Sequence, residues 1–293
     1  MARGGEYPGV VLESGLWAEI RPDRFRPGAF ELIVDGTPQS AVQPEDPTEL
    51  IFEYVQRMGV VLDQLPAGPL TAVHLGAGAL TLPRYIEATH PGSRQQVLEL
   101  EPRLVELVRA ELPLPRGASI RVRYGDARAT LATLPAALRG AADAVVVDIF
   151  GGGRIPPHVT SVEFYRAASA LLAPRGILLV NIADGADLAF ARGQAATVAD
   201  VLPHSAALAD TQMLKGRRFG NVVLLGSPAE LPLEWLPRIL AGGPHPSKVV
   251  QGRELTDWIA GARVVSDDSA TGSPSPMRTI FQMYERGHAP GTE

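Results

Sequence analysis

The sequence contains no cysteine among its 293 residues and only two lysines, Lys215 and Lys248. Without thiols it has no disulfide framework, no cysteine nucleophile and no thiolate-ligated zinc or iron–sulfur cluster. The six histidines lie far apart without His-x-x-x-His spacing, so we expect no metal site. The 27 basic and 32 acidic residues leave a net charge of −5, which argues against a nucleic-acid partner. A local exception is the cluster of Lys215, Arg217 and Arg218, a candidate anion site.

Long apolar runs are also missing. Gly, Pro, Arg or Asp interrupts every stretch before the ~18 to 20 residues that a membrane helix needs. The first residues include Arg3, Glu6 and Glu13 and show no apolar core followed by a small-residue cleavage site. We therefore expect a cytoplasmic protein with no membrane partner.

Two patterns divide the chain. Residues 1–47 predict a small N-terminal β region, with short strands at 10–12, 17–20 and 30–34, the last ending in the turn pair Asp35-Gly36. Apolar residues at helical spacing over 50–65 then predict a helix that leads into a main domain, 48–293. That domain alternates strands and helices, and its strands are apolar on consecutive residues, as in a doubly wound α/β sheet. The predicted strands are 72–75, 96–100, 120–124, 144–147, 176–181, 204–210 and 221–225.

Candidate ligand contacts follow the predicted strands, because ligands bind beyond the carboxyl ends of strands in an open parallel sheet. After the first strand, Gly76 and Gly78 allow a sharp turn and a close approach of the backbone to a ligand. Glu99 ends the second strand, where a carboxylate can accept both hydrogen bonds of a ribose diol. Each feature alone has a simpler interpretation: a plain turn for the glycines, and a helix N-cap or solvated acid for Glu99.

Two further acids follow the third and fourth strands. Asp126, followed by Ala127, can receive the exocyclic amine of an adenine, although a helix N-cap is the simpler interpretation. Asp148 ends the fourth strand, and the loop that follows it contains Gly151-Gly152-Gly153. Together the four features predict an adenosyl ligand and a Rossmann-like sheet of the S-adenosylmethionine-methyltransferase type. An NAD fingerprint is less well supported, because Thr81 stands where it needs a third glycine.

At these residues the chain resembles the spermidine synthase family of polyamine aminopropyltransferases, over roughly residues 30–228. The motifs that carry the resemblance are Asp35-Gly36-Thr37-Pro38-Gln39, Glu99-Leu100-Glu101, Gly125-Asp126-Ala127 and Phe219-Gly220-Asn221-Val222. The resemblance implies that Gln39 contacts the nucleoside, Glu99 the ribose and Asp126 the adenine. It also implies that Asp148 is the catalytic acid or base and that the protein forms a homodimer.

The chain departs from the family pattern where the substrates' amines bind. Ala79 stands where the family has an aspartate for the ammonium of the donor. Gly151-Gly152 stands where a second acid followed by proline is usual. The family's helix tyrosine is matched here to Phe52, with Glu53 and Tyr54 beside it. We therefore expect an altered acceptor site.

Full family membership implies aminopropyl transfer from decarboxylated S-adenosylmethionine to a small-molecule amine, with Asp148 taking the amine proton. A buried Asp148 would need a neighbouring donor, which the sequence does not identify. Two alternatives stay open: a methyltransferase using intact S-adenosylmethionine, whose carboxylate Arg84 could bind, and a non-catalytic nucleoside-binding protein. His158, Asp184 and Asp187 are minor candidates for substrate contact, with surface-loop and helix-start roles as the simpler interpretations.

Overall fold

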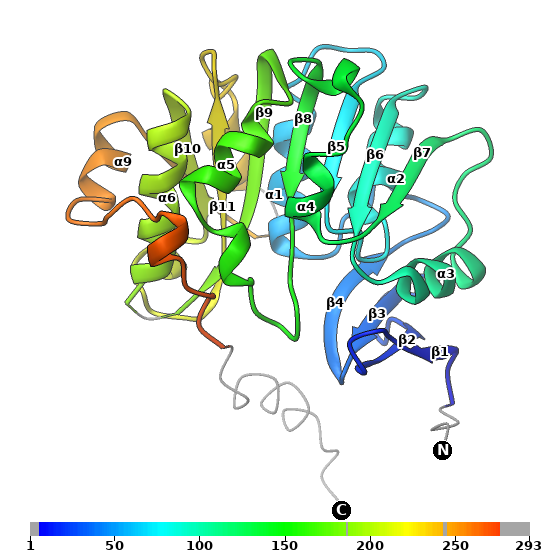
Figure 1. Ribbon diagram of the computed structural model, residues 1–293. Coiled ribbons are helices and arrows are strands. Elements are labelled where there is room, and N and C mark those ends of the chain that lie inside the picture. Colours follow the sequence, from blue (N-terminus) through cyan, green and yellow to red (C-terminus); the bar gives the residue numbers. More distant parts are fainter. Residues whose placement is uncertain (1–5, 186, 243–244, 276–293) are drawn as a thin grey trace, which may run out of the picture.

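The chain folds into two sheets in the computed structural model, which describes residues 6–185, 187–242 and 245–275 (Figure 1). The smaller sheet is antiparallel, has the order β1-β2-β3-β4, and consists of β1 (Gly9–Val11), β2 (Trp17–Pro22), β3 (Phe30–Val34) and β4 (Thr37–Val42). The larger sheet has eight strands in the order β12-β10-β11-β9-β8-β5-β6-β7.

The larger sheet is parallel in one half and antiparallel in the other. Its parallel strands are β5 (Thr71–Leu75), β6 (Arg94–Glu99), β7 (Ser119–Tyr124), β8 (Ala142–Val147) and β9 (Leu172–Asp184). Its antiparallel strands are β10 (His204–Ala209), β11 (Gly220–Ser227) and β12 (Lys248–Gln251). The chain runs outward from β5 to β7 on one side and returns through β8 on the other. Adjacent β5 and β8 therefore form the switch point at which ligands bind in such sheets.

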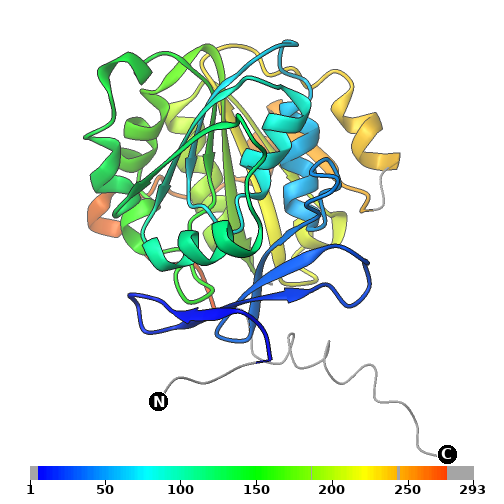
Figure 2. The ribbon, with the colours of Figure 1, turned by 90° about the vertical axis from the view of Figure 1, so that its right-hand side faces the viewer.

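Helices cover both faces of the larger sheet, which confirms the doubly wound α/β architecture (Figures 1 and 2). One face is covered by α1 (Glu53–Leu62), α2 (Thr81–Thr89) and α8 (Leu236–Gly242). The other is covered by α4 (Ala127–Leu131), α5 (Val162–Ser169), α6 (Ala189–Val201) and α9 (Gly252–Trp258). Helix α3 (Pro102–Glu111) packs on β1 and β2, and short α7 (Thr211–Leu214) packs on β11.

The central strands are apolar on consecutive residues because alternate side chains enter two different cores. In β8, Val145 and Val147 pack with α5 and α6, whereas Ala144 and Val146 pack with α1 and α2. Each strand end is therefore held from both faces, and the loops that follow it start from a rigid base.

The smaller sheet lies at the carboxyl ends of the parallel strands (Figure 2). The carboxylate of Glu101, after β6, accepts hydrogen bonds from the backbone N–H groups of Glu13 (2.8 Å) and Ser14 (3.1 Å). The hydroxyls of Ser40, in β4, and Thr81, in α2, are 2.9 Å apart. The N-terminal strands are thereby tied to the edge that carries the candidate site.

Three elements differ from the sequence expectations. Strand β4 was not predicted because it contains Pro38, which is tolerated here because β4 is an edge strand. Edge strand β12 was also missed. The sequence over 127–138 predicts one helix, but α4 ends at Leu131, and a separate 3-10 turn, Ala136–Leu138, follows Pro135, which has no N–H to continue the helix.

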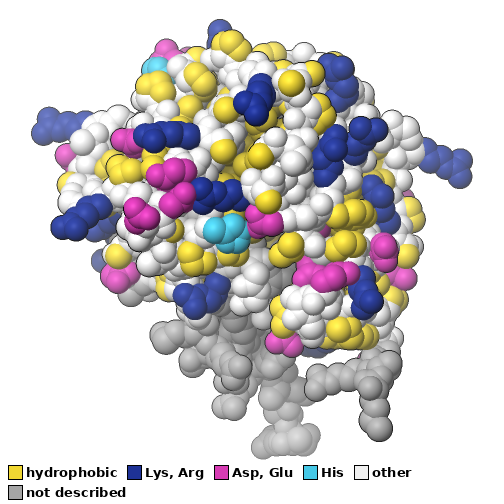
Figure 3. Space-filling model, in the orientation of Figure 1, with side chains coloured by type: hydrophobic (Ala, Val, Ile, Leu, Met, Phe, Trp, Pro, Cys, Tyr) yellow, Lys and Arg dark blue, Asp and Glu magenta, His cyan; other side chains and the backbone are white. Residues whose placement is uncertain are grey.

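The surface shows no dominant charge of one sign on the face seen in Figure 3, where basic and acidic side chains are interspersed with apolar ones. Among the described residues, no helix has both the length and the apolar character needed to cross a membrane.

Candidate functional site

The glycine turn after β5 brings two strand ends and β4 together. Gly76 has φ +100°, and a Cβ there would lie 2.1 Å from the carbonyl oxygen of Asp148, so only glycine fits. Gly78 has φ +49°, and a Cβ there would lie 3.2 Å from the Ser40 hydroxyl. The turn therefore lies against the end of β8 on one side and β4 on the other.

Asp148 is held by side chains from elements far apart in the sequence. The Tyr54 hydroxyl, in the first turn of α1, donates to Oδ2 at 3.0 Å. The Asn181 amide, near the end of β9, donates to Oδ1 at 2.8 Å. Asn221, in β11, donates in turn to the Asn181 amide oxygen at 2.9 Å. Each carboxylate oxygen of Asp148 therefore has one protein donor and keeps further acceptor capacity.

The surroundings of Asp148 suit a group that takes and returns a proton. Burial raises the pKa of its carboxyl above the ordinary aspartate value, although the hydrogen bonds from Asn181 and Tyr54 oppose that shift. Burial and the charge of Asp148 raise the pKa of Tyr54 well above its usual range, so the phenol remains a donor. The residue as a whole is nevertheless partly exposed.

Glu99 is fixed between the glycine turn and the start of α3. Its Oε2 accepts from the Ala77 N–H at 2.8 Å, and its Oε1 accepts from the Glu101 N–H at 3.0 Å. Burial raises the pKa of Glu99, with these backbone hydrogen bonds acting in the opposite direction. Its carboxylate is thus oriented at the strand end, with lone pairs left for hydroxyl donors.

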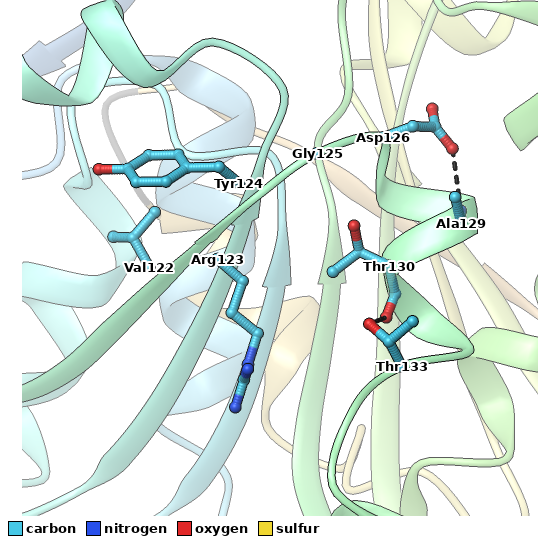
Figure 4. Close-up of a pocket in the computed structure, with 8 residues that line it drawn as sticks. All are labelled: Val122, Arg123, Tyr124, Gly125, Asp126, Ala129, Thr130 and Thr133. Carbon is cyan, nitrogen blue, oxygen red and sulfur yellow. Dashed lines mark hydrogen bonds between the residues drawn. The ribbon is translucent and has the colours of Figure 1, made fainter.

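Asp126 is the N-cap of α4, the simpler of its two interpretations (Figure 4). Its Oδ1 accepts from the Ala129 N–H at 2.9 Å, and its Oδ2 lies 2.7 Å from Nε2 of His158. Burial would raise the pKa of Asp126, but the Ala129 N–H and His158 outweigh it and lower the pKa. Ala127 is buried as the first residue of the helix.

An open hollow of about 580 Å³ lies beside Asp126, lined from β7 and α4 by Val122, Arg123, Tyr124, Gly125, Asp126, Ala129, Thr130 and Thr133 (Figure 4). It includes neither Asp148 nor Glu99 nor the glycines of the turn. The hollow therefore adjoins the candidate adenine contact at Asp126, whereas Asp148, Glu99 and the glycine turn lie outside its lining.

Gln39 lies at an irregularity of β4. Leu32 pairs with Ser40 and Ile33 with Pro38, so Gln39 is the extra residue between them. Such a bulge redirects side chains, and the neighbouring Ser40 contacts the glycine turn. Gln39 therefore lies next to the residue of β4 that contacts the glycine turn.

Phe52, which the resemblance matches to the family's helix tyrosine, precedes α1 and packs against apolar neighbours, whereas the adjacent Tyr54 contacts Asp148. One expectation needs correction. Arg84 is not available for a substrate carboxylate, because it is 2% exposed and its guanidinium donates to the backbone carbonyls of Ala79, Leu112 and Pro113. Burial lowers the pKa of Arg84 to about 10.

The three minor candidates, His158, Asp184 and Asp187, have different hydrogen-bond partners. His158 reaches Asp126, as described, and so lies beside the candidate adenine contact. Asp184 is 1% exposed, and its carboxylate accepts from the Gly185 and Ala191 N–H groups, both at 2.7 Å, at the start of α6. Asp187 is exposed and accepts from the Ala189 N–H at 3.2 Å. The described residues contain no group of three His, Asp or Glu side chains that could hold a metal ion.

Comparison with known proteins agrees with this architecture, although no family model matches the chain. A polyamine aminopropyltransferase of Chromobacterium violaceum is 26% identical over 146 residues, covering 50% of this chain and 54% of the relative. The corresponding protein of Vibrio vulnificus is 27% identical over 142 residues, covering 47% and 46%. The chain thus spans about half the length of the curated relatives it matches.

The solved structures extend the similarity to nearly the whole chain. A probable spermidine synthase from Corynebacterium glutamicum superimposes with a TM-score of 0.79 at 28% identity, covering 89% of this chain and 96% of that one. The chain is thus similar to a spermidine synthase in both sequence and fold. Human methyltransferase-like protein 13, in complex with SAH, shares the fold of this spermidine synthase-like chain, with a TM-score of 0.50 at 19% identity over 60% and 82% of the two chains.

Proposed function

We propose that this chain is an aminopropyltransferase that uses decarboxylated S-adenosylmethionine as co-substrate and a small amine as acceptor. The observation that carries the proposal is the Asp148 carboxylate, held by Tyr54 and Asn181 beside the glycine turn. The names of the curated relatives and of the C. glutamicum structure support the same reaction class.

The proposed reaction is an in-line displacement. The lone pair of a neutral amine forms a bond to the methylene carbon beside the donor's sulfonium, and the carbon–sulfur bond breaks with its electrons passing to sulfur. Methylthioadenosine leaves as a neutral thioether. The proton lost by the attacking nitrogen passes to Asp148, whose raised pKa suits a general base. Tyr54 and Asn181 hold the carboxylate in one orientation throughout.

The donor would lie across the glycine turn. Gly76 and Gly78 let the backbone approach it, and the fixed carboxylate of Glu99 would accept from the ribose hydroxyls. Asp126 and Ala127 would contact the adenine from the start of α4, and Gln39 would contact the nucleoside from β4. On the resemblance alone, we also propose that the protein is a cytoplasmic homodimer. Sedimentation equilibrium would measure the number of subunits.

The alternatives are weaker for specific reasons. Methyl transfer from intact S-adenosylmethionine needs a basic or backbone partner for the donor's carboxylate, and Arg84, one such candidate, is committed to three backbone carbonyls. A non-catalytic role leaves unexplained why the interior keeps a carboxylate with two side-chain donors, since burying a charged group is costly.

The deciding experiment combines binding and turnover. Calorimetry with methylthioadenosine, S-adenosylhomocysteine and both donor forms should show preference for the decarboxylated donor and methylthioadenosine. Mass spectrometry should detect an aminopropylated amine. Asp148→Asn should lower kcat by about 10²–10⁴-fold while leaving methylthioadenosine affinity within about twofold.

The matched control is Asp200→Asn, at an exposed pair with Arg166, which should change neither quantity. Preference for intact S-adenosylmethionine would replace the proposal by methyl transfer. Absence of nucleoside binding would rule out both activities.

A further inference from the structure

The 265–273 segment, which follows α9 in the chain, lies against the loop of residues 149–161 between β8 and α5. The hydroxyl of the buried Ser273 accepts from the Ile155 N–H at 2.9 Å, and the Ser273 N–H donates to the Ile155 carbonyl at 3.1 Å. At the other end of the segment, the Val265 carbonyl accepts from the first N–H of α5 at 2.8 Å. Uncharged contacts therefore fix the segment on the loop.

Asp267 lies between these contacts, in the 3-10 turn Asp267–Ser269. Its carboxylate accepts from both terminal nitrogens of Arg128, in α4, at 2.7 and 2.6 Å. These bonds and one from the Ser161 hydroxyl lower the pKa of Asp267 to about 2. An exposed ion pair contributes little to stability, but the paired contact between a guanidinium and a carboxylate is directional. Asp267 therefore fixes the direction in which the Arg128 side chain points.

Arg128 connects Asp267 with His158. The same Nη1 that contacts Asp267 also donates to the backbone carbonyl of His158 at 2.9 Å. On the imidazole, Nε2 of His158 lies 2.7 Å from Oδ2 of Asp126. Because the pKa of Asp126 is lowered, its carboxylate is an anion that only accepts, so Nε2 carries the hydrogen. A continuous series of contacts therefore connects Asp267 with Asp126.

His158 determines how firmly the carboxylate of Asp126 is oriented. The Ala129 N–H holds Oδ1 at 2.9 Å, and His158 holds the other oxygen, so the plane of the carboxylate is fixed at two points. The side chain of Asp126 is still 37% exposed, and its oxygens keep lone pairs for a further donor. An acceptor that is already oriented loses less conformational freedom when a ligand binds. Loss of the His158 contact should therefore weaken a ligand that donates to Asp126.

We propose that Asp267 is a positioning residue for nucleoside binding, because its bond to Arg128 fixes the carboxylate of Asp126 in place. The inference rests on the proposed aminopropyl transfer, in which Asp126 contacts the adenine. Asp267 is 139 positions from Arg128 and lies outside residues 30–228, over which the motifs resemble the family. The 265–273 segment thus completes the nucleoside side of the site.

The test measures the affinity of the full chain for methylthioadenosine by calorimetry. Asp267→Asn should raise the Kd about five- to tenfold, as for residues in one hydrogen-bond network. Asp268→Asn, which removes the same charge from the next exposed residue of the turn, is the matched control and should leave the Kd within about twofold. In turnover, Asp267→Asn should raise KM for the decarboxylated donor and leave kcat within about twofold, because only binding is affected.

A double-mutant cycle separates positioning from a general loss of structure. In a His158→Ala background, Asp267→Asn should change the Kd by less than about twofold, because the contact through which it acts is already absent. Arg128→Lys keeps the charge but not the paired contact, so it should weaken binding as Asp267→Asn does. Asp267→Glu keeps a carboxylate and should retain part of the affinity. Thermal melting shows whether each variant is folded, and Arg128→Lys gives the same test if Asp267→Asn unfolds.

The outcomes distinguish this inference from the proposed function. An unchanged Kd in Asp267→Asn, or an equal effect of Asp267→Asn with and without His158, would overturn the positioning role and leave aminopropyl transfer intact. An unchanged Kd in Asp126→Ala would do the same, because Asp126 would then not contact the nucleoside. Failure of the wild-type chain to bind methylthioadenosine would overturn the proposed function and the positioning role together.

Discussion

Two aspartates at the same edge of the sheet have opposite electrostatic surroundings. Asp148, after β8, is bound by side chains from α1 and β9, and burial raises its pKa. Asp126, after β7, caps the helix that follows it, contacts His158 and has a lowered pKa, with its side chain 37% exposed. Both were predicted as site residues from their positions after strands, yet of the two only Asp148 has a raised pKa.

The difference comes first from burial, because the carboxyl of Asp148 is buried more deeply than that of Asp126, and then from the hydrogen-bond donors. A helix N-terminus offers N–H groups to the residue immediately before it, so Asp126 is stabilised as an anion by local structure. Asp148 receives only two side-chain donors, and these do not compensate fully for burial. The Asp148 carboxyl is therefore protonated more readily than that of Asp126, whose N-cap and His158 contacts favour the charged form.

We expect the largest loss of stability from a substitution at Gly76, which lies against the backbone of Asp148. In Gly76→Ala, the added Cβ would meet the Asp148 carbonyl, at a clash cost of about 1–3 kcal/mol beyond the ~1–2 kcal/mol of a left-handed alanine. Gly117→Ala, at φ +87° with nothing within 4 Å, isolates the conformational cost alone. Urea unfolding should show the larger loss for Gly76→Ala, and equal losses would contradict the close approach.

The raised pKa of Asp148 is tested next by Tyr54→Phe. Removing a donor to the carboxylate removes a contribution that lowers its pKa, so the pKa of Asp148 should rise further. The acidic limb of the kcat/KM profile should therefore move to higher pH with the same acceptor. An unchanged limb would mean that Asp148 is not the base. Tyr85→Phe, whose hydroxyl binds Asp63, is the matched control and should not move it.

We expect the smallest loss of stability from substitutions at Asp126 and at His158, which contacts it. Asp126→Ala should cost about 1 kcal/mol of stability through loss of the cap, whereas His158→Ala should cost less because the cap remains. Because the folded-state pKa of Asp126 is lowered, its contribution is present above the ordinary aspartate pKa and is lost as pH falls through the folded value. The difference in unfolding free energy between wild type and Asp126→Ala should therefore shrink in acid. A constant difference would contradict the lowered pKa.

Local sequence was enough to locate the strands and the residues that follow them. Consecutive apolar residues such as Val145-Val146-Val147 mark strands covered on both faces, and the carboxyl ends of parallel strands share one edge. Gly76, Glu99, Asp126 and Asp148 are therefore recognisable from their positions along the chain. Asn181 carries a weaker signal, because it is a polar residue directly after the apolar run Leu178-Leu179-Val180.

By itself, the sequence determined the doubly wound sheet, the glycine turn and the acids at the strand ends, because each depends on residues close together along the chain. Only the tertiary structure decided which groups surround those acids. Tyr54 reaches Asp148 across 94 positions, and Arg218 reaches Glu53 across 165. Such pairings depend on the packing of α1 against the sheet and on strand order, so no local pattern could distinguish Tyr54 from Phe52 or show that Arg84 is buried.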